Sequence, residues 1–300
     1  MKLLICTQAV DENDPVLGFF ARWIEEFSKH SESVEVICLK AGRFNLPENV
    51  RVHSLGKERG VTSRAAHAWR FFSLAWRLRR DYDAVFVHMN PEYLVLAGWL
   101  WRALGKRSAL WYTHKSVNLK LRLAVLYANV VFTASPESFR LPTKKLQVMG
   151  HGIDTDFFTP DLSVARGEGW LSVGRLSPSK RHDLALRAAA QAGRELRIAG
   201  EGPERHHVES LAKELNTRVA FLGPLTQAQL RDEYRRAALL IHRSETGSLD
   251  KVVLEAAACG LPVDTTDPAL AKLPLGVEYV RDRHSLRKLI PRILTGLSHG

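Results

Sequence analysis

Two cationic side chains stand close together in the segment VGRLSPSKRHD, where Arg175 and Lys180 are five residues apart. The Gly, Ser and Pro residues around them predict a turn, and the sequence after Lys180 predicts the start of a helix. Free backbone N–H groups at a helix N-terminus, combined with two cations, are typical of a site for phosphate or another anion. The alternative is that both side chains are solvated loop charges.

A second candidate for anion binding lies in the segment SETGSLDKVVLEAAACG. Residues 246–248 are small and predict a turn before a helix that starts near Leu249, and the amides there would attract phosphate oxygens. Glu255 follows Asp250 by five positions in an otherwise apolar helix. A carboxylate in such surroundings needs a partner or a ligand. Glu255 is therefore a candidate binding residue, and the alternative is a carboxylate paired within the structure.

The segment GEGPE at 200–204 begins like a dinucleotide-binding fingerprint, but Arg205 occupies the place of its third glycine. We interpret it as a sharp turn between a strand and a helix, with Glu201 and Gly202 lining a ligand cleft.

Three positions in the first half of the chain follow predicted strands. His88 ends the strand AVFVHM, where an imidazole could donate or accept a proton near neutral pH, and His114 ends WYTH in the same way. The alternative for each is a structural histidine. Gly18 closes the loop DENDPVLG and would let the backbone approach a ligand.

The elements that must position these residues alternate between strands and helices. The 300 residues suffice for two domains, and short apolar runs separated by helical patterns favour an α/β fold with parallel strands. We expect two doubly wound, Rossmann-like domains at 1–152 and 153–300, joined by a polar, Asp- and Gly-rich linker that begins after Gly152. Ligands of such sheets bind beyond the carboxyl ends of the strands, so we expect the functional residues in a cleft there. The expected strands are 3–7, 34–40, 49–55, 84–89, 108–114, 129–135, 145–152, 169–176, 196–202, 219–225, 238–244, 261–266 and 276–280.

The charge of the chain is uneven. Its formal net charge is +11; residues 1–150 contain 22 basic and 13 acidic side chains, and residues 151–300 contain 21 and 19. An anionic partner is indicated, either a nucleic acid, a phospholipid surface or a phosphorylated substrate, and the alternative is an ordinary basic surface. No nucleic-acid-binding motif accompanies the charge, so we expect no nucleic acid partner.

The predicted helix 63–80 is basic and amphipathic. Its cationic side is expected at Arg70, Arg77 and Arg80, opposite a side that includes Trp69 and Trp76. Docking of this helix on an anionic membrane surface is one interpretation, and a core-facing helix with a solvated arginine stripe is the other.

Several classes of protein are excluded by the sequence. Three scattered cysteines without a CxxC pair support neither a disulfide framework nor a cysteine zinc site. The longest apolar stretch, 93–101, is well short of the roughly 18 residues of a membrane-spanning helix, and the N-terminus is too polar for a signal peptide. We expect a cytoplasmic protein.

Five segments, taken together, carry a family resemblance. VMGHGIDTDFFTP, LSVGRLSPSKRHDLAL, LRIAGEGPE, VAFLGPL and LEAAACGLPV resemble the retaining, family 4 glycosyltransferases of the GT-B fold in order and spacing, across roughly 146–265. The Gly18 loop, HMNPEY and TASPES carry a looser likeness in the first half. The resemblance implies a nucleotide-sugar donor in the second domain and an acceptor in the first.

The resemblance also implies roles for individual residues. Arg175 and Lys180 would bind the diphosphate, the amides of Gly247 and Ser248 would contact the distal phosphate and the sugar, and Glu255 would bind the ribose. His88 would lie near the reacting carbon.

One departure from the family concerns the donor site. Gly247 stands where the first glutamate of the E-x7-E element belongs, so a neighbouring carboxylate such as Asp250 either contacts the sugar or donor selectivity is altered.

A second departure is the short tail after residue 281: either the chain is compact, or the family's helix that packs back on the first domain is lacking.

The expected function is transfer of a sugar, with retention, from a nucleotide diphosphate sugar to a lipid-linked or polysaccharide acceptor of the cell envelope. The cations and amides would stabilise the leaving diphosphate, so we expect neither a metal nor another cofactor. The alternative is a catalytically altered GT-B module that binds nucleotide-sugar.

Overall fold

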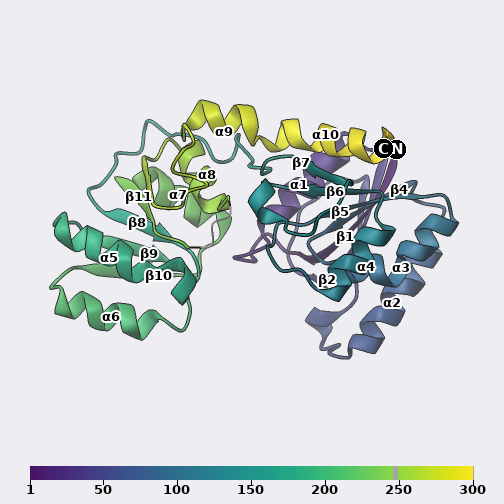
Figure 1. Cartoon of the computed structure of the whole chain (residues 1–300), viewed down its shortest axis with the longest axis horizontal. Coiled ribbons are helices and arrows are strands. Elements are labelled where there is room, and N and C mark those ends of the chain that lie inside the picture. Colours follow the sequence, from purple (N-terminus) through teal and green to yellow (C-terminus); the bar gives the residue numbers. More distant parts are fainter. Residues whose placement is uncertain (246–248, 300) are drawn as a thin grey trace. The chain divides into compact units, whose positions relative to one another are not determined.

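The computed structural model describes residues 1–245 and 249–299, and it divides into two compact units. The first unit contains residues 1–152 and the chain from Leu286 onward, and the second is Ile153–Ser285. Each unit is built on one sheet whose paired strands are all parallel, with helices on both faces (Figure 1). The predicted α/β class with two parallel-sheet domains is confirmed.

The first sheet has seven strands in the order β3-β2-β1-β4-β5-β6-β7. The chain builds outward from β1 in one direction as far as β3 and then returns to add β4 on the other side. The carboxyl ends of β1 and β4 therefore flank the point where the strand order reverses. The strands are β1 (Lys2–Val10), β2 (Ser33–Ala41), β3 (Val50–Ser54), β4 (Ala84–His88), β5 (Arg107–Trp111), β6 (Val130–Thr133) and β7 (Leu146–Val148).

Two sets of helices cover the first sheet. α1 (Phe19–Lys29) and α10 (Leu286–His299) pack on one face, and α2 (Arg64–Arg77), α3 (Glu92–Ala103) and α4 (Leu119–Tyr127) pack on the other. Side-chain caps begin two of them: the Ser63 hydroxyl accepts a hydrogen bond from the Ala66 amide at 3.3 Å, and Asn118 accepts one from the Leu121 amide at 2.9 Å.

The second sheet has the order β10-β9-β8-β11-β12, so its reversal point lies between β8 and β11. Its strands are β8 (Trp170–Val173), β9 (Leu196–Ala199), β10 (Val219–Gly223), β11 (Leu239–His242) and β12 (Val263–Thr265). α5 (His182–Gln191) and α6 (Arg205–Glu214) cover one face, and α7 (Gln227–Arg236), α8 (Lys251–Ala258) and α9 (Val277–Arg283) cover the other.

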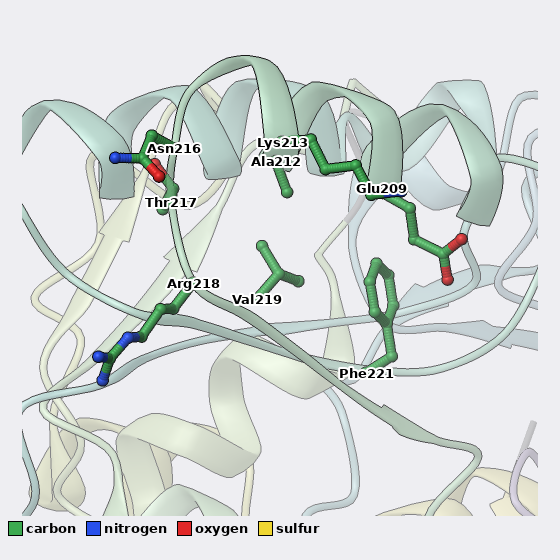
Figure 2. Close-up of a pocket in the computed structure, with 8 residues that line it drawn as sticks. All are labelled: Glu209, Ala212, Lys213, Asn216, Thr217, Arg218, Val219 and Phe221. Atoms are coloured by element: carbon green, nitrogen blue, oxygen red, sulfur yellow. The ribbon is translucent and has the colours of Figure 1, made fainter.

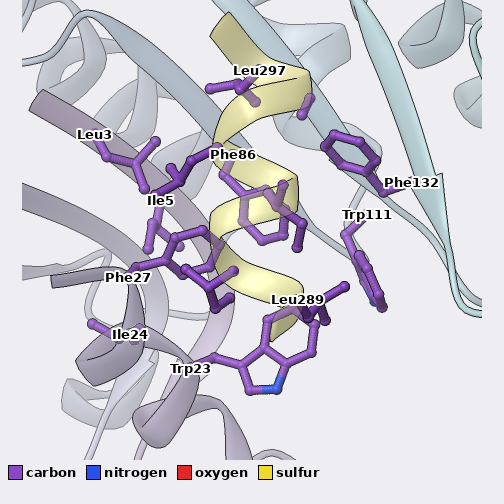
Figure 3. Packing of buried hydrophobic residues seen from close by; sticks show 14 of the residues in the cluster. Leu3, Ile5, Trp23, Ile24, Phe27, Phe86, Trp111, Phe132, Leu289 and Leu297 are labelled. Carbon is purple, nitrogen blue, oxygen red and sulfur yellow. The ribbon is translucent and has the colours of Figure 1, made fainter. Parts of the chain in front are cut away.

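The C-terminal helix α10 belongs to the first unit. Its apolar stripe, which includes Leu289, Ile290 and Ile293, is buried against aromatic side chains of the first sheet and of α1, among them Trp23 and Phe132 (Figure 3). The expected boundary between residues 152 and 153 coincides with the division of the structure, but the expected second domain 153–300 differs from it. α10 packs back on the first unit in this way.

Residues 276–280, expected to be a last strand, lie instead at the start of α9. Val277 and Val280 are three positions apart and share one face of this helix, and Val280 is fully buried. Five residues with two valines are compatible with the period of a strand and with the period of a helix. The segment forms a helix because its apolar side chains then pack against α8.

Candidate functional site

The candidate site lies at the carboxyl edge of the second sheet, beside the reversal point between β8 and β11. The loop that follows β8 contains Arg175 and Lys180, and the loop that follows β11 leads to Asp250, the N-cap residue of α8. Ligands of parallel sheets bind at this position, so the fold brings the predicted anion loop to the expected place.

Three close backbone contacts set the shape of the loop after β8. A Cβ atom on Gly200 would lie 2.0 Å from the Gly174 carbonyl oxygen, and one on Gly202 would lie 2.2 Å from the Leu176 carbonyl oxygen. The Leu176 amide donates to the Glu201 carbonyl at 3.0 Å. The glycines of GEGPE therefore let two loops pack backbone to backbone, so Gly202 has a packing role that the sequence interpretation did not include.

Lys180 is held in an ion pair. Its ammonium group lies 2.7 Å from Oδ2 of Asp250, and Nε2 of His242 lies 2.9 Å from the same oxygen. His242 Nδ1 lies 2.9 Å from the Thr265 hydroxyl. Burial raises the pKa of Asp250, but the His242 hydrogen bond and the Lys180 charge outweigh it and hold that pKa well below its usual range. Asp250 is therefore an anion that fixes the ammonium group of Lys180.

The same two loops are joined at a second place. Arg181 forms ion pairs with Asp183 and with Glu245, and the Glu245 amide donates to the Ser179 carbonyl at 3.0 Å. Arg181 has a positive φ of 49°, a conformation that non-glycine residues adopt at a cost and that these contacts stabilise. The loop after β8 is thereby fixed against the loop after β11.

Arg175 differs from its neighbour Lys180. Its side chain is exposed, and within the described part of the chain it forms no ion pair. A guanidinium group in this state can bind an anion without first leaving a carboxylate. Glu201, predicted to line the site, pairs with Arg205 at 2.6 Å and is half exposed.

Glu255 is almost completely buried on α8. Its carboxylate lies 2.7 Å from the Lys251 ammonium group, one helical turn earlier, and accepts a hydrogen bond from the Tyr234 hydroxyl at 3.3 Å. This is the alternative that the sequence left open, a carboxylate paired within the structure. Binding of a ribose by Glu255 stays a prediction, and it would require exchange of the Lys251 partner for a hydroxyl. Gly247 and Ser248 lie outside the described residues.

His88 is buried among aromatic side chains. Its ring stacks on Phe20 with centroids 4.0 Å apart, the rings of Phe19 and Trp23 lie about it, and Nδ1 is 3.4 Å from the Thr7 hydroxyl. Only 3% of the residue is exposed. These are the surroundings of a structural histidine, the alternative stated for this residue, and a catalytic role for His88 stays a prediction.

The other two predicted positions of the first unit have local contacts. A Cβ atom on Gly18 would lie 2.6 Å from the Asp14 carbonyl oxygen, so this glycine lets its own loop close. His114 is exposed and accepts a hydrogen bond from the Ser116 amide at 3.0 Å.

Sequence reasoning missed several members of the site. His242, Lys251 and Tyr234 contact the predicted carboxylates from positions up to 21 residues away in the chain, and Thr265 contacts the other ring nitrogen of His242. His242 ends an apolar strand exactly as His88 does, so the signal used for His88 was present there as well.

A hollow of about 690 Å³ lies elsewhere in the second unit. Figure 2 shows Glu209 and Lys213 of α6 above Val219 and Phe221 of β10, with Arg218 at the entrance to the strand. Its position at the amino ends of the strands is opposite to the edge where parallel sheets bind ligands. We therefore do not place the functional site there.

Within residues 1–245 and 249–299, no three His, Cys, Asp or Glu side chains form a cluster suited to a metal ion. In the same part of the chain, none of the helices combines the length and apolar character needed to cross a bilayer. The expected independence from metals stays a prediction.

Comparison with known proteins shows that the candidate site lies in a part of the chain that matches a family model. Residues 166–271 match the family model of glycosyl transferases group 1. The D-inositol 3-phosphate glycosyltransferase of Mycobacteroides abscessus is 36% identical over 151 residues, which are 44% of this chain and 33% of that relative. The match thus spans about a third of the length of the curated relative.

Solved structures match the chain over nearly its whole length. Anabaena Alr3699/HepE in complex with UDP superposes with a TM-score of 0.74 at 17% identity, covering 99% of this chain and 100% of that one. WaaG, a glycosyltransferase involved in lipopolysaccharide biosynthesis, superposes with a TM-score of 0.62 at 15% identity, covering 99% and 100%. These likenesses show that the fold is the GT-B fold.

Proposed function

We propose that the chain is a glycosyltransferase that takes a sugar from a nucleotide diphosphate sugar, binding this donor at the carboxyl edge of the second sheet. The observation that carries the proposal is the fixed loop of Arg175 and Lys180, tied to the N-terminus of α8 within the region that matches glycosyl transferases group 1. Anabaena HepE forms complexes with UDP and UDP-glucose, which makes UDP-sugars the first donors to test.

The two cations have different tasks in this proposal. Arg175 is exposed and binds an oxygen of the diphosphate directly. Asp250 fixes the position of the Lys180 ammonium group, so Lys180 loses little side-chain conformational entropy when it binds the diphosphate. Glu255 binds the ribose when its contact with Lys251 is exchanged.

The proposed chemistry is transfer with retention at the anomeric carbon of a hexose. As the bond between this carbon and the diphosphate breaks, negative charge grows on the leaving phosphate oxygen, and Arg175 and Lys180 stabilise it more strongly than in the ground state. That oxygen then accepts the proton of the attacking hydroxyl, so no side-chain nucleophile is needed. Because two cations hold the diphosphate, we propose that activity needs no metal ion or other cofactor.

We propose a lipid-linked or polysaccharide acceptor of the cell envelope, bound by the first unit. WaaG is involved in lipopolysaccharide biosynthesis, which supports an acceptor of this kind. His88 contacts a substrate only if its stack on Phe20 opens.

We propose further that the first unit docks on the cytoplasmic side of an anionic membrane. Trp69, Phe72 and Trp76 share one stripe of α2, and the Phe72 ring stacks on Trp99 of α3 with centroids 5.8 Å apart. We call these four residues the tryptophan face. Trp69, Trp76 and Trp99 are 72%, 47% and 50% exposed, an arrangement that suits the boundary between water and lipid.

The structure corrects the expected arrangement of this helix. The apolar side chains form two stripes: Phe71, Ala75 and Leu78 are buried, and the tryptophans lie on another side. Arg70, expected on the cationic side, donates to the Leu55 carbonyl at 2.9 Å.

Nucleotide release tests the proposed function. The native chain is incubated without acceptor with UDP-, GDP-, ADP- and dTDP-sugars, with and without EDTA, and compared with Arg175→Ala, Lys180→Ala and the control Arg187→Ala, an exposed arginine on α5. We expect release of one nucleotide, unaffected by EDTA and by the control, and lowered at least 100-fold by either site variant, about 2.7 kcal/mol.

A second function competes on a specific observation. Lys180 and Glu255 are both ion-paired within the chain, and Gly247 replaces an acidic residue, which is compatible with a module that binds nucleotide-sugar without turnover. Such a module would be stabilised by a nucleotide and would release none, even when lipid and glycan acceptors are supplied.

A further inference from the structure

The first unit contains a pocket of its own at the reversal point of its sheet. The pocket has a volume of about 350 Å³ and lies between α2 and α3. Gln8 near the end of β1 and Asn90 just after β4 line it, and these two strands flank the reversal point of the sheet. Parallel sheets bind ligands beyond the carboxyl ends of their strands at the reversal point, which is the place of the candidate site in the second unit. This pocket has the corresponding position in the first unit.

The walls of the pocket combine apolar and cationic side chains. Leu39, Leu55, Phe71 and Leu96 form the apolar part. Arg64, His67 and Lys120 supply the nitrogen donors, and Arg64 is exposed without an ion pair inside the described part of the chain. Lys120 pairs with Glu92 at 2.9 Å, so the only carboxylate of the lining is neutralised from within the pocket.

His67 supplies an independent sign of a missing ligand. Its Nε2 atom is shielded from solvent and has no hydrogen-bond partner among the described residues, although a buried ring nitrogen ordinarily has one. His67 is three positions after Arg64 on α2, so both side chains lie on the same face of this helix, and both line the pocket. A ligand oxygen between them would satisfy both groups.

The surrounding charge selects an anion. Among the charged residues that line the pocket, Arg64 and Lys120 are cations and Glu92 is an anion, so these side chains leave an excess of positive charge. An anion of one or two charges meets cations at Arg64 and Lys120, while an apolar portion of the same molecule meets the leucines.

We infer that this pocket binds the phosphate-bearing head group of an amphiphilic molecule. Arg64 and His67 donate to the phosphate oxygens, and the leucines contact the apolar portion adjacent to the phosphate. The identification of this molecule as the glycosyl acceptor rests on the proposed function, but the binding itself does not. A membrane lipid and a soluble phosphomonoester share the chemistry of the phosphate, and their apolar portions distinguish them.

Calorimetric titration of the full chain tests the inference with three probes. Dihexanoyl phosphatidate below its micellar concentration carries both features, glycerol 1-phosphate carries the phosphate alone, and dihexanoylglycerol carries the apolar portion alone. We expect saturable binding of the phosphatidate, at least tenfold weaker binding of glycerol 1-phosphate, and none of dihexanoylglycerol. Equal affinities for the two phosphates would assign the pocket to a soluble phosphomonoester and overturn the amphiphile.

Variants locate the binding. Arg64→Gln and His67→Asn should each weaken phosphatidate binding at least tenfold. Arg187→Gln removes one positive charge from the second unit and should leave the affinity unchanged. In native protein, the ring resonances of His67 should shift on titration. Binding that survives both pocket variants, or no saturable binding of either phosphate, would overturn the inference.

The same samples separate this inference from the proposed function. Thermal stabilisation by UDP reports on the second unit. Phosphatidate binding without any nucleotide binding would leave the pocket in place and remove the glycosyltransferase proposal, and the reverse result would remove the pocket alone.

Discussion

At the scale of single residues, Lys180 and Asp250 form an ion pair whose side chains are 20% and 18% exposed, so both lie mostly buried beside the anion loop. Two partners, Lys180 and His242, keep the Asp250 carboxylate ionised. If Asp250 lost its charge, the Lys180 ammonium group would lose the opposite charge that compensates it. Lys180 therefore presents to a diphosphate an ammonium group that is fixed in position and already paired with the Asp250 carboxylate. Its contribution depends on Asp250 as much as on its own ammonium group.

Asp250→Asn tests this dependence. The amide keeps the shape of the side chain and removes its charge. The positive charge of Lys180 is then no longer compensated by a carboxylate, so it attracts the nucleotide more strongly, but the ammonium group loses its fixed position. We expect the rate of nucleotide release to fall at least tenfold while the Kd for UDP stays the same or decreases. Asp232→Asn, on a half-exposed residue paired with Arg231, is the control and should change neither quantity. A weaker Kd with an unchanged rate would contradict a positioning role.

His182 gives a prediction for the dependence of stability on pH. It begins α5 beneath the anion loop, with Nδ1 2.9 Å from the Ser172 hydroxyl, and burial lowers its pKa to about 4. In the unfolded chain His182 binds a proton near pH 6.5, and in the folded chain it does not. Its contribution to the free energy of unfolding is therefore fully present above pH 6.5 and is lost as the pH decreases toward 4. The loss is on the order of 3 kcal/mol, since one pKa unit corresponds to about 1.4 kcal/mol.

Melting temperatures between pH 7.5 and 4.5 measure this effect. His182→Gln should flatten the decrease in Tm with falling pH, whatever its effect on Tm at pH 7.5. His206→Gln alters a histidine whose side chain is 95% exposed and should leave the slope as in the native chain. Equal slopes in all three proteins would show that protonation of His182 is not coupled to unfolding.

At the scale of elements, α10 carries the clearest stability prediction. Ile293 is fully buried in the cluster that contains Trp23, Phe27 and Phe132 (Figure 3). Ile293→Ala removes buried methyl groups and leaves a cavity, so we expect a loss of about 2–5 kcal/mol in the free energy of unfolding of the first unit. Urea unfolding followed by tryptophan fluorescence measures it. Ser298→Ala changes an exposed residue of the same helix and should cost less than about 0.5 kcal/mol, and an equal loss in both variants would exclude the cavity as the cause.

The elements themselves were largely predictable from the sequence, because hydrophobic period and turn residues are local signals. The strand–helix alternation and the boundary after Gly152 depend on such signals. The assignment of α10 to the first unit does not: Leu289 and Ile293 reveal an apolar stripe, but the stripe fits any apolar surface. Its partner, Trp23, is more than 250 residues away in the chain.

The site shows the same division between local and distant information. The residue types near Arg175 predicted an anion loop, and the fold brings that loop to the reversal point of its sheet. The pairing of Lys180 with Asp250 joins positions 70 residues apart, and no local pattern could assign it. A ligand contact at Gly202 stays a prediction, because a glycine leaves the same signal in a sequence whether a ligand or another backbone approaches it, and the structure shows the second of these at the Leu176 carbonyl.

At the scale of the whole molecule, the excess of positive charge and the exposed tryptophans occur in the same unit. Residues 1–150 carry a net charge of +9 by the count above, and the tryptophan face lies on two helices of that part. Arg79 lies 4.4 Å above the Trp76 ring, so a cation is held beside the aromatic surface. Each cation near an anionic lipid surface contributes about 1 kcal/mol, and buried tryptophan area adds to it.

Sedimentation with lipid vesicles tests this combination of charge and aromatic surface. We expect the native chain to bind vesicles with 30% phosphatidylserine and to release them as salt is raised from 0.1 to 0.5 M, because the shorter Debye length screens the cations. Trp69→Ser with Trp76→Ser should lower the partition coefficient at least tenfold, about 1.4 kcal/mol. Leu162→Ser alters a fully exposed apolar side chain of the second unit and should change nothing. Equal binding to neutral and anionic vesicles would show that the charge takes no part, and binding unaffected by the double variant would place the contact on another surface of the protein.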